Sequence, residues 1–239
     1  MEPMGLRAVT LDFGGTLAEG EIDWDEYHMA IHSLLRGRGF TLPLRKVKSS
    51  ISAALERLRR VRESNRELTL EEVYAYALKR MDIPPTDELL EEIHSLFRQH
   101  FRSTPYPCIE EVVRSLSHRY RLAVISNTMS DTPRHVLRSL GLDGYFDVIL
   151  CSRDLGIRKP DPRIFHHVLE EMDVKPEEAV HVGDSLEADV EGALKAGMRA
   201  IWVRGSQPES WSGPTIKTIC ELPEMLKTLE KLPSDREQI

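Results

Sequence analysis

The stretch AVTLDFGGTLAEG, residues 8–20, opens with a short apolar and β-branched run that is typical of a buried strand. The run ends at Asp12, which is followed by a turn containing Gly14 and Gly15. A carboxylate at a strand end is commonly a turn or helix-cap residue. In an open α/β sheet, however, the same position faces the ligand site. The rest of the chain decides between these two interpretations.

The composition is that of an ordinary globular protein, with 41% hydrophobic and 30% charged residues among 239. A net charge of −7 argues against nucleic acid as a partner. No apolar run approaches the roughly 20 residues of a membrane span, and the first residues lack the pattern of a secretion signal. We therefore expect a cytoplasmic protein with no membrane partner. Cys108, Cys151 and Cys220 are odd in number and far apart, so we expect free thiols and neither a disulfide framework nor a zinc site.

Two kinds of periodicity alternate along the chain. Residues 22–103 repeat apolar side chains at helical spacing and predict about four helices, one of them opened by a capping box at Thr69 and Glu72. Strand-like and helical segments alternate afterwards. The predicted strands are 121–127, 146–152, 178–184 and 199–204, and the predicted helices lie near 132–140, 161–172 and 186–196.

This alternation predicts a parallel sheet covered by helices on both faces. The first strand, residues 6–13, must belong to that sheet, because an isolated strand before a helical bundle is not stable. The predicted fold is therefore α/β, with a Rossmann-like doubly wound parallel-sheet core and an inserted helical-bundle cap. The core would comprise residues 1–17 and 105–239, and the cap residues 18–104.

Polar side chains follow four of the predicted strands. The first strand is followed by Asp12 and Thr16, and the next ends at Ser126 and Asn127. Lys159 lies in GIRKPDP, and GDSLEAD contains Asp184 and Asp189. Each motif alone is ordinary turn or cap chemistry. Because the carboxyl ends of parallel strands meet at one edge of a sheet, we expect these side chains to converge.

In these four motifs, LDFGGTL, ISN, KPDP and GDSLEAD, the sequence resembles the haloacid dehalogenase superfamily over nearly its whole length. The helical insertion resembles that superfamily's mobile cap. The resemblance implies that Asp12 is a nucleophile. It also implies that Ser126 and Lys159 hold the reacting group and that Asp184 ligates magnesium.

The chemistry of the residues agrees with those roles. A carboxylate that attacks a phosphate faces repulsion between two anions, which a hard divalent cation held by oxygen ligands removes. Asp12, Asp184 and the carbonyl of Gly14 would bind Mg²⁺. Lys159 would keep Asp12 ionised and offset charge on the transferred group.

Four further side chains have supporting roles in this hypothesis. Donors for the phosphoryl oxygens would come from Thr16, Ser126 and Asn127. Asp189 would orient Lys159 or a metal-bound water. Arg36 and Arg38 stand at the predicted end of the first cap helix, where they complement the helix dipole or reach an anionic substrate.

One expected acid is missing. Phosphatases of the superfamily usually place a second aspartate two positions after the nucleophile, where it protonates the leaving group. Here that position is Gly14, and general acid–base catalysis is worth about 10²–10⁴ in rate. We predict a magnesium-dependent phosphatase that acts on a small phosphorylated molecule through an aspartyl-phosphate on Asp12. It would favour acyl or aryl phosphates or borrow an acid from Glu19, Asp23 or His28.

Three alternatives remain open. A metal-independent 2-haloacid dehalogenase also lacks that aspartate, although the acidic GDSLEAD motif counts against it. A phosphonatase needs a cap lysine for a Schiff base, for which Lys46, Lys48 and Lys79 are available. A non-catalytic protein that keeps a phosphate or metal pocket is the third. The basic run 57–66 is interpreted as a solvated helix face.

Overall fold

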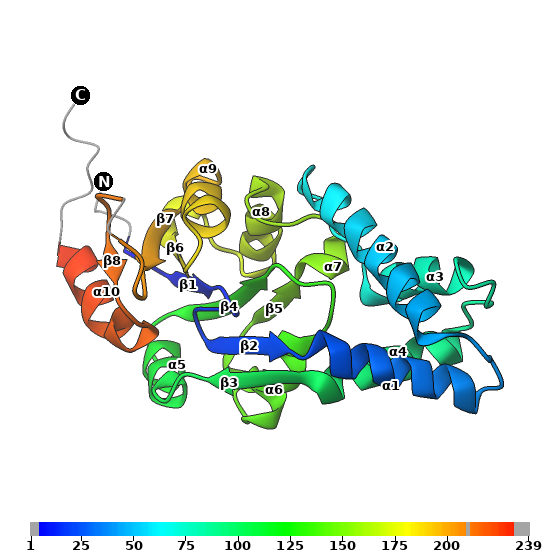
Figure 1. Cartoon of the computed structure of the whole chain (residues 1–239). Coiled ribbons are helices and arrows are strands. Elements are labelled where there is room, and N and C mark those ends of the chain that lie inside the picture. The colour runs from blue at the N-terminus through cyan, green and yellow to red at the C-terminus, as the bar shows by residue number, and fades with distance from the viewer. Residues whose placement is uncertain (1–4, 209–210, 232–239) are drawn as a thin grey trace.

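The computed structural model describes residues 5–208 and 211–231 and has at its centre a six-stranded parallel sheet in the order β5-β4-β1-β6-β7-β8 (Figure 1). The strands are β1 (Ala8–Leu11), β4 (Arg121–Ser126), β5 (Val148–Cys151), β6 (Ala179–Gly183), β7 (Arg199–Val203) and β8 (Thr215–Ile216). This arrangement confirms the predicted Rossmann-like α/β class. β1 lies between β4 and β6, which places its carboxyl end near the middle of the sheet.

Helices cover both faces of the sheet, as buried parallel strands require. Val9 and Leu11 of β1 pack in one apolar cluster with α5, α6 and α10, while Ala8 packs in another with α8 and α9. These helices are α5 (Ile109–Ser117), α6 (Thr132–Ser139), α7 (Ser152–Leu155), α8 (Pro162–Glu171), α9 (Gly192–Lys195) and α10 (Leu222–Lys231). Three 3₁₀ turns complete the core, at Asp143–Tyr145, Pro176–Glu178 and Ile219–Glu221.

The insertion, between β2 (Ala18–Ile22) and β3 (Phe101–Pro105), contains four helices with an apolar cluster of their own. They are α1 (Trp24–Gly37), α2 (Leu44–Arg62), α3 (Leu70–Lys79) and α4 (Asp87–His100). The predicted capping box is present, since Thr69 accepts from the amide of Glu72 and Glu72 accepts from that of Thr69. The exact division into residues 1–17 with 105–239 and residues 18–104 stays a prediction; residues 1–4 and 232–239 lie outside the described residues.

Two strands that the sequence did not predict connect the insertion to the core. β2 (Ala18–Ile22) and β3 (Phe101–Pro105) pair in an antiparallel ribbon beside the large sheet (Figure 1). An added Cβ at Gly20 would lie 2.6 Å from the ring of Phe101, so the ribbon needs glycine there. The polar sequence AEGEI of β2 lacks an apolar alternation, which is why it did not read as a strand.

The segment predicted as a helix over 186–196 begins instead as a π-helical turn, Leu186–Glu191, and becomes α9 only at Gly192. Ser185 opens this turn by accepting from the amide of Ala188, 3.1 Å away. The Ser185 amide donates to the carboxylate of Asp189 at 2.9 Å. The wider turn therefore directs Asp189 inward, in the way that π turns often do at functional sites.

The expectation of three free thiols is wrong. Cys108 and Cys220 form a disulfide across 112 residues, with 5.6 Å between their Cα atoms, whereas Cys151 is free and buried. Cys108 directly precedes α5, and Cys220 lies in the 3₁₀ turn before α10, and both helices cover the same face of the sheet. The pairing follows from that packing. Of the helices that the structure describes, none is long and apolar enough to cross a bilayer.

Candidate active site

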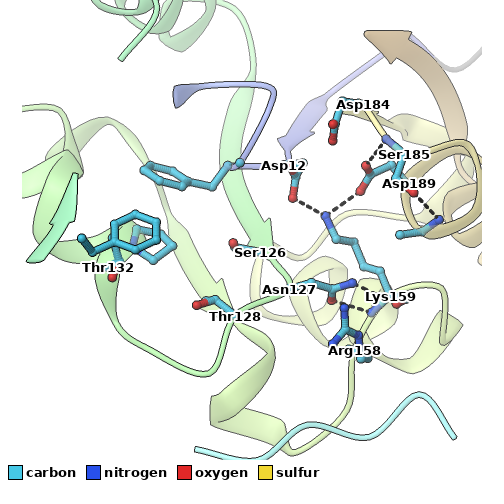
Figure 2. Close-up of a pocket in the computed structure, with 15 residues that line it drawn as sticks. Asp12, Ser126, Asn127, Thr128, Thr132, Arg158, Lys159, Asp184, Ser185 and Asp189 are labelled. Carbon is cyan, nitrogen blue, oxygen red and sulfur yellow. Dashed lines mark hydrogen bonds and ion pairs between the residues drawn. The ribbon is translucent and has the colours of Figure 1, made fainter. Parts of the chain in front are cut away.

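A cavity of about 380 Å³ opens at the carboxyl ends of β1, β4 and β6 (Figure 2). Its wall combines acidic, basic, hydroxyl and aromatic side chains: Asp12, Phe13, Gly14, Phe101, Ser126, Asn127, Thr128, Thr132, Pro133, Arg158, Lys159, Asp184, Ser185, Ala188 and Asp189. Of the eight residues that the sequence assigned to a site, seven line this cavity. Thr16 does not, because its hydroxyl is fully buried and has no hydrogen-bond partner among the described residues.

The ammonium group of Lys159 lies between two carboxylates. Its Nζ is 2.6 Å from Oδ1 of Asp12 and 2.6 Å from Oδ1 of Asp189. All three residues are at most 7% exposed. A buried lysine is expensive unless it is paired, so the two carboxylates hold it in its charged form.

The loop that carries Lys159 is fixed by Asn127. The Asn127 side chain accepts from the backbone amide of Lys159 at 2.9 Å and donates to its carbonyl at 3.0 Å. The side-chain amide of Asn127, which the sequence predicted as a donor to a phosphoryl oxygen, therefore positions this loop. Ser126 lies on the cavity wall between Asp12 and Thr128 (Figure 2). Its hydroxyl is the group that the sequence predicted as a donor to a phosphoryl oxygen.

A series of buried, hydrogen-bonded side chains next to Asp189 was not predicted from the sequence. His181 of β6 lies with Nε2 3.1 Å from Oδ1 of Asp189 and Nδ1 2.7 Å from the hydroxyl of Thr10 on β1. Burial lowers the pKa of His181, so its ring is neutral, and an ionised Asp189 can only accept. Nε2–H must then donate to Asp189 while the Thr10 hydroxyl donates to Nδ1. The pattern gave no signal, because Thr10 and His181 are ordinary members of buried strands.

Glycines make room for these carboxylates. Gly15 has a left-handed backbone (φ 75°), and a Cβ there would lie 2.4 Å from Oδ2 of Asp184. At Gly183 an added Cβ would lie 2.2 Å from Cγ of Asp189. Gly14 differs, since a Cβ at this position would meet no heavy atom within 4 Å. The missing acid at residue 14 is therefore not a consequence of crowding.

The electrostatics of the site favour a bound cation. Burial raises the pKa of Asp12 to about 7 against the opposing effect of Lys159, and burial and then Asp189 raise that of Asp184 to about 6. Burial also disfavours ionised Asp189, but Lys159 and His181 hold its pKa well below the usual range. Three carboxylates thus share one ammonium, and oxygens of Asp12, Asp184 and Asp189 lie within 4.8 Å of one another.

These residues fit a magnesium ion. Carboxylate and carbonyl oxygens are the ligands of Mg²⁺, and a divalent cation would balance the two uncompensated charges. Asp189 is already occupied by Lys159, His181 and the Ser185 amide, so Asp12 and Asp184 are the available pair. The carbonyl of Gly14, on the cavity wall, is the remaining protein ligand in the prediction.

Other predicted contributors lie elsewhere. None of Glu19, Asp23, His28, Lys46, Lys48, Lys79, Arg36 and Arg38 lines the cavity. The ammonium groups of Lys46 and Lys48 pair with Asp82 and Asp25, 3.4 and 2.6 Å away. Glu19 accepts from the hydroxyl of Tyr106 and contributes to the raised pKa of Asp184, so it is near the site but committed to another partner. A Schiff base on one of these cap lysines has no support in this arrangement.

Comparison with known proteins shows the family of the chain. The family model for haloacid dehalogenase-like hydrolases matches residues 6–197, and the chain belongs to that family. It is therefore a hydrolase. A phosphoserine phosphatase of Thermus thermophilus is 39% identical over 141 residues, which are 58% of this chain and 56% of that protein. A phosphoglycolate phosphatase of Aquifex aeolicus is 34% identical over 126 residues, 48% of this chain and 59% of that protein.

The matches with these curated relatives thus span little more than half of their length. Solved structures match over almost the whole chain. A 2-haloacid dehalogenase from Pseudomonas syringae pv. Tomato superposes with a TM-score of 0.68 at 27% identity, covering 94% of this chain and 99% of that one. A phosphatase of the family from Thermococcus onnurineus gives 0.60 at 26%, covering 92% and 98%. Both kinds of chemistry therefore occur among similar proteins.

Proposed function

We propose that this protein is a magnesium-dependent phosphatase that acts on a small phosphorylated molecule. The observation that carries the proposal is the convergence of Asp12 and Asp184 on one cavity beside the buried ammonium of Lys159. Three carboxylates beside one ammonium repel an anionic substrate, and a divalent cation bound between Asp12 and Asp184 would offset that repulsion. A metal-free reaction of a haloacid gives no role to Asp184, which lies half-buried on the cavity wall.

In this proposal an oxygen of Asp12 attacks phosphorus, the bond from phosphorus to the leaving oxygen breaks, and an aspartyl-phosphate forms. Lys159 opposes protonation of Asp12 and holds it in place, and Ser126 donates to a phosphoryl oxygen. Mg²⁺, held by Asp12, Asp184 and the Gly14 carbonyl, would supply neutralisation of the charge on the phosphoryl oxygens. Water then hydrolyses the aspartyl-phosphate and releases inorganic phosphate.

The cavity lacks a general acid for the leaving group. Its ionisable side chains, among the described lining residues, are Asp12, Asp184, Asp189, Lys159 and Arg158. The first four serve the nucleophile or the cation, and a guanidinium does not give up its proton. The proposal is therefore limited to substrates whose leaving group departs without protonation, such as aryl and acyl phosphates.

The test compares p-nitrophenyl phosphate, acetyl phosphate and an alkyl phosphate, each with and without magnesium. We expect turnover of the first two only with the metal, weak turnover of the third, and none with Asp12→Asn. Asp184→Asn should raise the magnesium concentration needed for half-maximal rate. Tight phosphate binding without any turnover would contradict the proposal and favour a binding protein.

The second candidate is a 2-haloacid dehalogenase, favoured by the structural match to such an enzyme and by Gly14. Halide leaves without a proton, as this cavity requires. Release of chloride from 2-chloropropionate in the presence of a chelator would support the dehalogenase over the phosphatase.

The cytoplasmic location predicted from the sequence stays a proposal. The Cys108–Cys220 disulfide argues against that location, because disulfides are rare in a reducing cytoplasm.

A further inference from the structure

One positively charged side chain that lines the cavity has no role in the proposed chemistry. The basic residues that line the cavity, within the described part of the chain, are Lys159 and Arg158. Lys159 is committed to Asp12 and Asp189. Arg158 makes a single side-chain contact, from Nη1 to Oε2 of Glu67 at 3.2 Å. The remaining N–H groups of its guanidinium have no partner among residues 5–208 and 211–231.

The charge of Glu67 is already shared. This carboxylate is fully buried, and its Oε1 accepts from Nε of Arg62 at 3.0 Å and from the amide of Leu68 at 3.2 Å. Its Oε2 accepts from the hydroxyl of Ser152 at 3.0 Å as well as from Arg158. Two arginines and one glutamate leave one positive charge in surplus. Burial and then the charge of Arg62 lower the pKa of Arg158, and Glu67 only partly opposes them.

Arg158 is held in position before any ligand arrives. Its backbone amide donates to the carbonyl of Asn65 at 3.0 Å, which holds it against the turn that follows α2. The next residue, Lys159, is fastened to Asn127 by two hydrogen bonds. In Figure 2 Asn127 lies between the labelled Asp12 and Arg158, and both of these residues line the same cavity. A small ligand bound at Asp12 therefore shares its cavity with Arg158.

We propose that Arg158 forms a subsite for a carboxylate on the substrate, so that the enzyme acts on phosphorylated carboxylic acids. This inference rests on the proposed phosphatase function and names its substrate class. A guanidinium presents paired N–H groups that match a carboxylate. One surplus positive charge matches the single negative charge of a carboxylate better than the higher negative charge of a second phosphate. The cavity volume suits a small molecule with both groups.

Affinity for matched, non-hydrolysable ligands tests the subsite directly. The two pairs are phosphonoacetate with phosphonoacetamide, and 4-carboxyphenylphosphonate with 4-carbamoylphenylphosphonate. Each pair differs only in carboxylate against amide. Binding to the full-length, magnesium-loaded protein is measured by calorimetric titration. In the pair whose length fits the cavity, the carboxylate ligand should bind at least about tenfold more tightly than the amide, because a hydrogen bond to a charged group is worth that much. Equal affinities in both pairs, or no binding, would overturn the subsite.

Variants separate this role from a structural one. Arg158→Gln should reduce the carboxylate-to-amide ratio to about one, and Arg158→Lys should leave an intermediate ratio because an ammonium has no fork. Glu67→Gln, which removes the opposing charge, should raise the ratio; Arg62→Gln, which frees Glu67 for Arg158, should lower it. Arg163→Gln is the control, because Arg163 is exposed and pairs with Asp161. A simple loosening of the fold would weaken both ligands alike and leave the ratio unchanged, against the proposal.

Hydrolysis assays with 4-carboxyphenyl phosphate and 4-carbamoylphenyl phosphate distinguish a failure of the subsite from a failure of the phosphatase function. If the carboxylate preference in binding is present but 4-carboxyphenyl phosphate is not hydrolysed, the subsite stands and the phosphatase function fails. If both aryl phosphates are hydrolysed and the phosphonates bind equally, the phosphatase function stands and the subsite fails.

Discussion

At the scale of single residues, Gly14 is what sets this chain apart from a phosphatase with its own general acid. Because a side chain at this position meets open space, Gly14→Asp should fold normally. The new carboxyl group can protonate a leaving oxygen. We expect turnover of an alkyl phosphate to rise about 10²-fold and that of an aryl phosphate much less, because an aryl oxide leaves unaided. Steady-state kinetics with both substrates measure the difference.

Gly14→Asn is the matched control for that change, since asparagine has nearly the same shape as aspartic acid and no acidic proton to transfer to a leaving group. It should leave the alkyl-to-aryl ratio of the wild-type protein unchanged. Equal gains for both substrates in Gly14→Asp would mean that leaving-group protonation is not what this glycine removed.

A second prediction at this scale concerns the proton on His181. Thr10→Val removes the hydroxyl that donates to Nδ1, so the ring is no longer held with its proton on Nε2, toward Asp189. Asp189 then holds Lys159 less firmly, and we expect kcat to fall about tenfold with KM unchanged. Thr10→Ser keeps the hydroxyl and should retain most of the rate. If this series of side chains served packing alone, the smaller serine would be the more damaging replacement.

At the scale of elements, the helices of the insertion contact the core through charged side chains. His94 of α4 lies with Nδ1 2.7 Å from Glu71 of α3 and Nε2 3.0 Å from Asp131, just before α6 of the core. Arg98 also approaches Asp131, at 3.5 Å, and Arg153 pairs with Glu71 at 2.9 Å. Although burial opposes it, hydrogen bonding to Asp131 and Glu71 raises the pKa of His94 to about 9.

This contact gives a pH dependence of stability with a definite sign. A histidine whose pKa is raised by folding stabilises the protein fully below its unfolded value, near 6.5, and loses that contribution as the pH rises through about 9. We expect the free energy of unfolding to fall by up to about 3 kcal/mol across this window. Urea denaturation at pH 6, 7.5 and 9 measures it.

The variant His94→Gln should flatten that dependence, whereas His167→Gln, which alters an exposed histidine on α8, should retain it. The same loss of stability with pH in His94→Gln would assign the effect to other groups.

At the scale of the whole molecule, the Cys108–Cys220 disulfide joins the residue before α5 to the 3₁₀ turn before α10. Closing a loop of 112 residues restricts the unfolded chain, so reduction should lower the free energy of unfolding by about 2–4 kcal/mol. Thermal unfolding with and without a reductant measures this change. The double variant Cys108→Ser and Cys220→Ser should be insensitive to reductant; an unchanged wild-type transition would contradict the prediction.

The sequence was sufficient for the class of fold and for most of the candidate site. Apolar periodicity reports local burial, so it located the strands and helices of the core, and parallel strands of known order bring their carboxyl ends to one edge. Asp12, Lys159 and Asp184 could therefore be placed together although Asp12 and Lys159 are 147 residues apart. The β2–β3 ribbon and the π turn at 186–191 were missed, because neither has a periodic apolar pattern.

What the sequence alone determined is which residues are buried, which elements they form, and that a carboxylate-rich site lies at the sheet edge with glycine in place of its acid. Only the tertiary structure decided the pairings: Thr10 with His181, Glu67 with two arginines, Cys108 with Cys220. The physical reason is range. A periodic pattern records the environment that each segment shares with its own neighbours. A hydrogen bond, an ion pair or a disulfide instead depends on a distance of a few ångströms between side chains that the chain holds far apart until it folds.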